Sequence, residues 1–120
     1  MSTILVVEDD DAIRGVVSEG LGLAGYRVVA VATSHEALRE IDSARPIDLA
    51  LIDIKMPPGN PHGFALGRMA RLRRGDLRLL FMSGDPAAAE AEGPTADGAI
   101  LLKPVRLKTL LASVRAELAR

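Results

Sequence analysis

A ten-residue stretch, residues 48–57, limits the possible folds more than any other part of the chain. It reads Asp-Leu-Ala-Leu-Ile-Asp-Ile-Lys-Met-Pro, so branched apolar residues follow one another with little polar alternation. Such a run is typical of a strand buried on both faces, as in a parallel sheet. The strand must end before Pro57, because proline has no N–H to donate to a neighbouring strand. Asp53 is therefore expected near the carboxyl end of a central strand, where open α/β sheets bind ligands.

Four other apolar runs alternate with segments of helical periodicity. The alternation predicts five parallel strands with helices on both faces of the sheet, joined by right-handed crossovers. It leaves the order of the strands in the sheet open. The strands are expected over residues 3–7, 26–31, 47–54, 77–82 and 99–102. The helices are expected over residues 13–24, 33–44, 63–73, 87–92 and 107–118.

Local signals indicate where several helices begin and end. Asp10 and Asp11 are suited to cap the first helix, and Gly25 is suited to end it. Thr33 and Glu36 have the spacing of a capping box at the start of the second helix. The residues at helical spacing that are expected to face the core include Val16, Leu72 and Leu107.

The composition excludes several classes of function. The chain has 120 residues, which suits one domain over residues 1–120. It has no cysteine, which excludes disulfides, thiol catalysis and thiolate metal sites. A net charge of −1 gives no basic field for nucleic acid or for an anionic membrane surface. The first residues lack the pattern of a secretory leader and no apolar run approaches membrane-spanning length, so a soluble cytoplasmic protein is expected.

Chemically active side chains follow four of the five predicted strands. Glu8 and Asp9 follow the first strand, Asp53 the third, Ser83 the fourth and Lys103 the fifth. In a parallel sheet these strand ends share one edge. Three carboxylates that converge there would repel one another, and a hard cation with oxygen ligands, such as Mg²⁺, relieves the repulsion. A carboxylate beside Mg²⁺ can attack phosphorus and form an aspartyl phosphate, with the lysine and the hydroxyl holding the phosphoryl oxygens.

Each of these features also has a plainer explanation. As minor alternatives, residues 8–11 could form only a capping turn, Ser83 could be only a turn residue, and Lys103 could be a solvated surface lysine. His35 is expected at the surface, where a helix starts. A solvated helix face, or alternatively a contact with an acidic partner, is expected for Arg68, Arg71, Arg73 and Arg74.

Four motifs together resemble the receiver domain of two-component response regulators, over essentially the whole chain. They are Ile4-Leu-Val-Val-Glu-Asp-Asp10, residues 48–57, Phe81-Met-Ser-Gly84 and Lys103-Pro104. The resemblance implies a flavodoxin-like (βα)5 fold with strand order 2-1-3-4-5. It also implies that a sensor histidine kinase or a histidine phosphotransfer protein gives a phosphoryl group to Asp53.

The same resemblance assigns roles to the other residues at the strand ends. It implies that Asp9 binds Mg²⁺ directly, that Glu8 acts through a water molecule, and that the backbone carbonyl of Lys55 is a further ligand. Ser83 matches the hydroxyl position and Lys103 the phosphoryl-contacting lysine, whose following proline the family usually carries in the cis form. The expected protein is a free-standing receiver that acts on an unknown downstream protein, although excision from a hybrid kinase or a longer regulator stays open.

The chain departs from the family pattern at positions that bear on signalling. Receivers usually have Tyr or Phe three residues before the lysine, whereas this chain has Ile100. We therefore expect normal phosphoryl transfer but an unusual surface change, one that does not spread across the fourth helix and fifth strand. Lys55 and Asp85 follow Asp53 and Ser83 by two residues, and their opposite charges are expected to slow hydrolysis of the phosphorylated form.

Three other functions are consistent with parts of the pattern. The first is a receiver-fold interaction module that phosphorylation does not switch, which Ile100 leaves open. The second is a Mg²⁺-dependent phosphatase, but Lys55 occupies the place of the second acid that this chemistry usually needs. The third is a flavin-binding electron carrier, and the acids after the first strand and the scarcity of aromatic residues argue against it.

Overall fold

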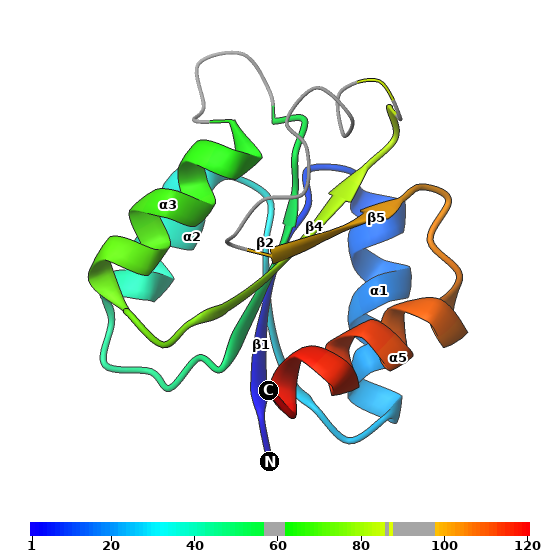
Figure 1. The fold of residues 1–120 in the computed structure, drawn as a ribbon, viewed down its shortest axis with the longest axis horizontal. Coiled ribbons are helices and arrows are strands. Elements are labelled where there is room, and N and C mark those ends of the chain that lie inside the picture. Colours follow the sequence, from blue (N-terminus) through cyan, green and yellow to red (C-terminus); the bar gives the residue numbers. More distant parts are fainter. Residues whose placement is uncertain (57–61, 86, 88–97) are drawn as a thin grey trace.

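A computed structural model describes residues 1–56, 62–85, 87 and 98–120, and it confirms the predicted α/β architecture. Five parallel strands form one sheet in the order β2-β1-β3-β4-β5 (Figure 1). The strands are β1 (Thr3–Val7), β2 (Arg27–Val31), β3 (Leu49–Asp53), β4 (Arg78–Ser83) and β5 (Gly98–Leu102). The helices within the described residues are α1 (Asp11–Leu23), α2 (Ser34–Asp42), α3 (Gly63–Arg73) and α5 (Leu107–Leu118). Apart from Ala87, the helix expected over residues 87–92 lies outside them.

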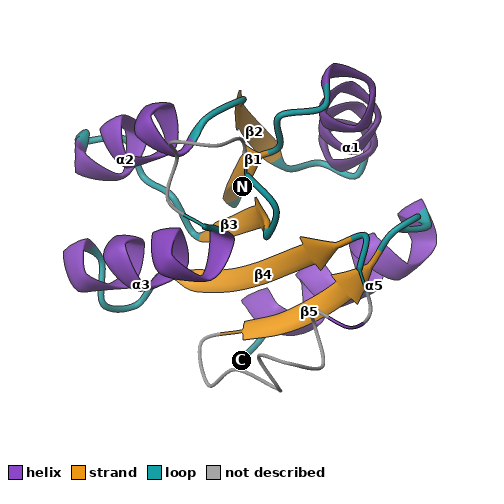
Figure 2. Ribbon diagram, turned by 90° about the horizontal axis from the view of Figure 1, so that it is seen from above, coloured by secondary structure: helices purple, strands orange, loops and turns teal. Residues whose placement is uncertain are grey.

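The helices divide into two layers, one on each face of the sheet. Figure 2 shows α2 and α3 on one side of the strands and α1 and α5 on the other. Successive strand residues point to opposite faces, so Leu5 and Val7 of β1 pack with the α2–α3 layer, and Ile4 and Val6 with the α1–α5 layer. All residues of β1 and β3 are buried. The prediction of central strands buried on both faces is thus confirmed.

The predicted core faces of three helices need correction. Val16 is 66% exposed, Leu72 87% and Leu107 42%. In α5 the core positions are Leu110 and Val114, at 1% and 0% exposure. A helix that lies on a sheet buries one stripe about 100° wide, and these helices carry apolar residues beyond that stripe. Periodicity alone does not tell which of two overlapping stripes faces the sheet.

The predicted helix ends are present in the structure. The Asp10 carboxylate accepts a hydrogen bond from the Ile13 N–H at 2.9 Å and caps α1. The Thr33 hydroxyl accepts from the Glu36 N–H at 3.1 Å and donates to the Glu36 carboxylate at 3.1 Å. Gly25, just after α1, has a φ of 100°, which glycine adopts without the strain that a side chain would cause.

The two edges of the sheet have different roles. The carboxyl ends of the strands carry the acids, whereas both chain termini lie at the opposite edge (Figure 1). At that opposite edge the Arg74 side chain donates to the carbonyls of Ile41 and Ser43, both at 2.8 Å. The Arg78 side chain donates to the carbonyl of Glu117 at 2.9 Å. These arginines satisfy backbone carbonyls near the ends of α2 and α5, which have no partner inside their own helix.

No helix among the described residues is long and apolar enough to cross a membrane.

Candidate functional site

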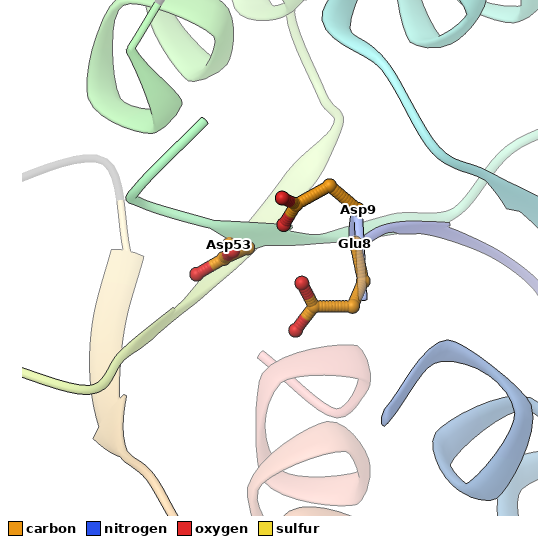
Figure 3. Close-up of side chains that lie close together, drawn as sticks. All are labelled: Glu8, Asp9 and Asp53. Atoms are coloured by element: carbon orange, nitrogen blue, oxygen red, sulfur yellow. The ribbon is translucent and has the colours of Figure 1, made fainter. Parts of the chain in front are cut away.

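Three carboxylates meet at the carboxyl edge of the sheet. Glu8 and Asp9 directly follow β1, and Asp53 is the last residue of the neighbouring strand β3. One carboxylate oxygen from each residue lies within 4.8 Å of the others (Figure 3). Glu8 and Asp53 are buried, while Asp9 is exposed. The parallel pairing of β1 with β3 therefore brings together the three acids that the sequence placed at strand ends.

Lys103, which follows β5, contacts two of these acids. Its Nζ lies 2.6 Å from Glu8 Oε1 and 3.3 Å from Asp53 Oδ1. Its backbone N–H donates to the Ser83 carbonyl at 2.7 Å, and the peptide bond to Pro104 is cis. The lysine thus places a positive charge against a buried pair of acids.

The shared charges alter the acidity of Glu8 and Lys103. The pKa of Glu8 is raised to about 7, chiefly by burial and also by the negative charge of Asp53, while the hydrogen bond from Lys103 acts to lower it. Burial lowers the pKa of Lys103, but its hydrogen bond to Glu8 and the charge of Asp53 outweigh burial and raise it overall. Lys103 is therefore a cation at neutral pH, whereas Glu8 is partly protonated when no metal ion is bound.

Ser83 is buried at the end of β4, but its hydroxyl group is engaged within its own turn. Ser83 Oγ donates to the Asp85 carbonyl at 3.0 Å and accepts from the Asp85 N–H at 3.1 Å. The Asp85 carboxylate in turn accepts from the Ala87 N–H at 2.9 Å. The hydroxyl thus stabilises the turn, and donation to another acceptor would require it to release the Asp85 carbonyl.

Of the remaining predicted positions, Lys55 borders this centre. Lys55 is exposed and lines a hollow of about 510 Å³ together with Asp9, Asp53 and Lys103. Asp85 is also exposed, and no ion pair joins it to Lys55 among the described residues. Ile100 is half-buried in β5 and packs against the core on the α2–α3 side.

The sequence reasoning missed Arg14, which the structure places behind the acidic turn. Its guanidinium group donates to the carbonyl of Glu8 at 3.0 Å and to the Asp11 carboxylate at 2.5 Å. The spacing of three residues between Asp11 and Arg14 is a helical ion-pair signal that was available in the sequence. The contact with the Glu8 carbonyl depends on the path of the turn between β1 and α1, which the spacing of residues does not reveal.

The donor set at this edge fits Mg²⁺. All the available side-chain ligands are carboxylate oxygens, two of them buried, and their charges are only partly offset by Lys103. Hard oxygen ligands in small number suit Mg²⁺, which usually keeps several of its water molecules. The exposed side of the hollow leaves space for that water.

Comparison with known proteins identifies the family. The model of the response regulator receiver domain matches residues 4–115. Response regulator MprA of Mycolicibacterium vanbaalenii is 36% identical over 119 residues, which cover 98% of this chain and 50% of MprA. The receiver protein CpdR of Brucella abortus is 33% identical over 120 residues, covering 95% of this chain and 94% of CpdR.

A solved structure supports the same assignment. A response regulator receiver protein from Sinorhizobium medicae has a TM-score of 0.88 at 28% identity, and the match covers 98% of this chain and 94% of that chain. The chain spans about half the length of MprA and nearly the whole of CpdR. The arrangement of acids and lysine at the sheet edge, the strand order and the match over residues 4–115 lead to one conclusion: the chain belongs to the response regulator receiver domain family.

Proposed function

We propose that this protein is the phosphoacceptor of a two-component system or phosphorelay, with Asp53 as the acceptor. The observation that carries the proposal is the meeting of Glu8, Asp9 and Asp53 within 4.8 Å, with Lys103 in contact with two of them. The expected phosphodonor is the phosphohistidine of a sensor kinase or of a histidine phosphotransfer protein.

In the proposed reaction an oxygen of the Asp53 carboxylate attacks phosphorus. The new P–O bond forms as the bond between phosphorus and the donor imidazole nitrogen breaks, and that nitrogen takes up a proton from water. Lys103 is within reach of Asp53 and is suited to bind a phosphoryl oxygen after it moves away from Glu8. The Ser83 hydroxyl would donate to a second phosphoryl oxygen in place of the Asp85 carbonyl.

The residues that would hold Mg²⁺ are Asp9 and Asp53 by their carboxylates, Lys55 by its backbone carbonyl and Glu8 through water. The ion would supply positive charge that neutralises the transferring phosphoryl group. Glu8 must give up its proton to serve this role, and burial opposes that step.

The proposed output is a change in protein binding, or transfer of the phosphoryl group onward. CpdR, of which this chain covers 94%, is named a response regulator receiver protein, and this similarity supports the proposed receiver role. MprA is named a response regulator and is twice as long as this chain. The comparison with MprA therefore concerns only the half of MprA that this chain matches. Because the expected phosphodonor is a sensor kinase or a phosphotransfer protein, the proposed location of the protein is the cytoplasm.

The test is the intact mass of the protein after incubation with Mg²⁺ and acetyl phosphate. One added phosphoryl group is expected for the wild type, and none without Mg²⁺ or in Asp53→Asn. Asp76→Asn, which removes an exposed carboxylate outside the site, should still gain the group. Absence of both an adduct and Mg²⁺ binding would favour the interaction module that phosphorylation does not switch.

A further inference from the structure

Arg14 connects the start of α1 to the end of β1. Its Nη1 lies 3.0 Å from the Glu8 carbonyl oxygen, and its Nη2 lies 2.5 Å from Asp11 Oδ1. The Arg14 side chain is 24% exposed, whereas that of Asp11 is 91% exposed. An ion pair with so exposed a partner contributes little to stability. The contact with the backbone carbonyl therefore says more about the role of Arg14.

The carbonyl that Arg14 holds belongs to the peptide group between Glu8 and Asp9. This peptide group is planar, so fixing its oxygen also fixes the direction in which the Asp9 backbone leaves it. Asp9 is exposed, and its side chain has no hydrogen bond or ion pair within the described part of the chain. The position of its carboxylate therefore depends on the backbone that Arg14 holds.

The Glu8 side of the same peptide is held independently. The Glu8 N–H donates to the Val31 carbonyl at 3.1 Å, and its carboxylate accepts from Lys103 and from the Asp10 N–H. Glu8 would keep these contacts if Arg14 were replaced. Arg14 is thus the side chain that acts on the Glu8 carbonyl itself.

We propose that Arg14 is a positioning residue for the cation site, one that keeps Asp9 in reach of Asp53 by holding the Glu8–Asp9 peptide group. The inference rests on the proposed function, because it concerns the same Mg²⁺ site. Two effects of Arg14 on Mg²⁺ have opposite signs. Its positive charge repels the cation, so its removal should tighten binding, whereas loss of its positioning contact should weaken binding.

The experiment is a Mg²⁺ titration of metal-free protein, followed by the backbone amide signals of residues 9 and 10 in NMR spectra. In Arg14→Gln the dissociation constant for Mg²⁺ is expected to rise on the order of tenfold, as for other residues that orient a metal ligand. In Arg14→Lys the charge stays, but the single amino group cannot reach the Glu8 carbonyl while it pairs with Asp11, so binding should again weaken. Arg39→Gln removes the same charge from an exposed position on α2 and should leave binding unchanged.

The outcomes separate this inference from the proposed function. Binding in Arg14→Gln that equals or exceeds that of the wild type, with unchanged signals from the buried strands, overturns the positioning role. If Arg14→Gln does not fold, Arg14→Lys decides, because an effect of charge alone predicts wild-type binding for it. A wild-type protein that binds no Mg²⁺ overturns the proposed function, and this inference with it.

Discussion

Glu8 is fully buried, and its carboxyl group has to serve two states of the site. It lies 2.6 Å from Lys103 and close to Asp53, and its pKa is raised to about 7, chiefly by burial. In the proposed metal-bound state it must be ionised. The protonation of this one residue therefore links folding, cation binding and pH.

The stability of the metal-free protein is expected to fall as pH rises between about 4.5 and 7. Over this range the folded protein binds a proton on Glu8 that the unfolded chain releases, so the proton favours the folded state only at the lower pH. We expect the free energy of unfolding, relative to that of Glu8→Gln, to decrease by on the order of 1–3 kcal/mol across this range. Denaturant unfolding at a series of pH values measures the difference.

Saturating Mg²⁺ provides a control for the Glu8 prediction. Mg²⁺ favours the ionised carboxylate, so it should reduce the loss of stability toward neutral pH. Parallel pH profiles for the wild type and Glu8→Gln without metal would contradict the raised pKa.

Lys55 is predicted to lengthen the lifetime of phosphorylated Asp53. Lys55 borders the hollow beside Asp53 and is exposed, as is Asp85 after Ser83. Opposite charges at these positions can pair across a phosphoryl group and hinder the approach of water. Lys55→Ala should then lose phosphate faster in a mass-spectrometric time course, while Lys108→Ala on α5 should not. An unchanged lifetime in Lys55→Ala would rule out the role.

At the scale of single residues, the sequence indicated which residue types form the site and at which edge of the sheet they lie. Parallel strand ends must meet, so Glu8, Asp53 and Lys103 could be grouped from strand positions alone. The sequence could not show that Lys103 lies nearer to Glu8 than to Asp53, or that the Ser83 hydroxyl bonds to Asp85. Those details depend on side-chain torsions, which neighbours in space determine.

The start of α3 lies unusually close to the end of β3. The Gly63 N–H donates to the Ile54 carbonyl at 2.9 Å. A Cβ atom added to Gly63 would lie 2.5 Å from the Ile54 Cα and 2.6 Å from the Asp53 carbonyl oxygen. Both neighbours are backbone atoms, so the contact cannot be relieved by rotating a side chain. Glycine here lets α3 support the strand that carries Asp53.

Gly63→Ala is therefore expected to destabilise the protein by about 1–3 kcal/mol, because the added methyl group must push the helix away from the strand. Gly15→Ala on α1 is the matched control, since a Cβ atom there would have no neighbour within 4 Å. In an exposed helical position alanine should stabilise by about 0.5–1 kcal/mol. Thermal or denaturant unfolding of the two variants measures both effects, and equal shifts would contradict the close-contact argument.

The boundaries of elements were easier to predict than the faces they bury. The third strand was expected over residues 47–54 and is observed as Leu49–Asp53, since apolar runs and prolines limit strands strongly. Val16 and Leu72 were expected in the core, yet both are mostly exposed. The face that a helix buries depends on the position of the sheet beneath it, which local periodicity does not contain.

Across the whole molecule, the proposed signalling would require a change at Asp53 to reach a distant surface. Ile100 lies in β5 opposite Phe81 of β4 and packs with the core on the α2–α3 side. Its branched Cβ atom restricts rotation about χ1, and it has no ring that could turn inward. The coupling between the site and β5 that an aromatic residue would provide is therefore expected to be weak.

Phosphorylation is predicted to shift amide NMR signals near Asp53, Ser83 and Lys103 without spreading along β5. Ile100→Tyr supplies the missing ring and should extend the shifts into residues 98–102. Large shifts throughout β5 in the phosphorylated wild type would show that Ile100 does not limit the coupling. Shifts absent even at Asp53 would instead point to a failure of phosphorylation.

Both termini lie at the edge of the sheet opposite the acids (Figure 1). At that edge the Arg78 side chain of β4 donates a hydrogen bond to the Glu117 carbonyl near the end of α5. This arrangement has a consequence for modular design. A reporter protein fused at either end would be attached on the far side from Asp53, so its bulk would not obstruct a phosphodonor. The receiver can in this way be combined with different fusion partners while its chemistry stays accessible.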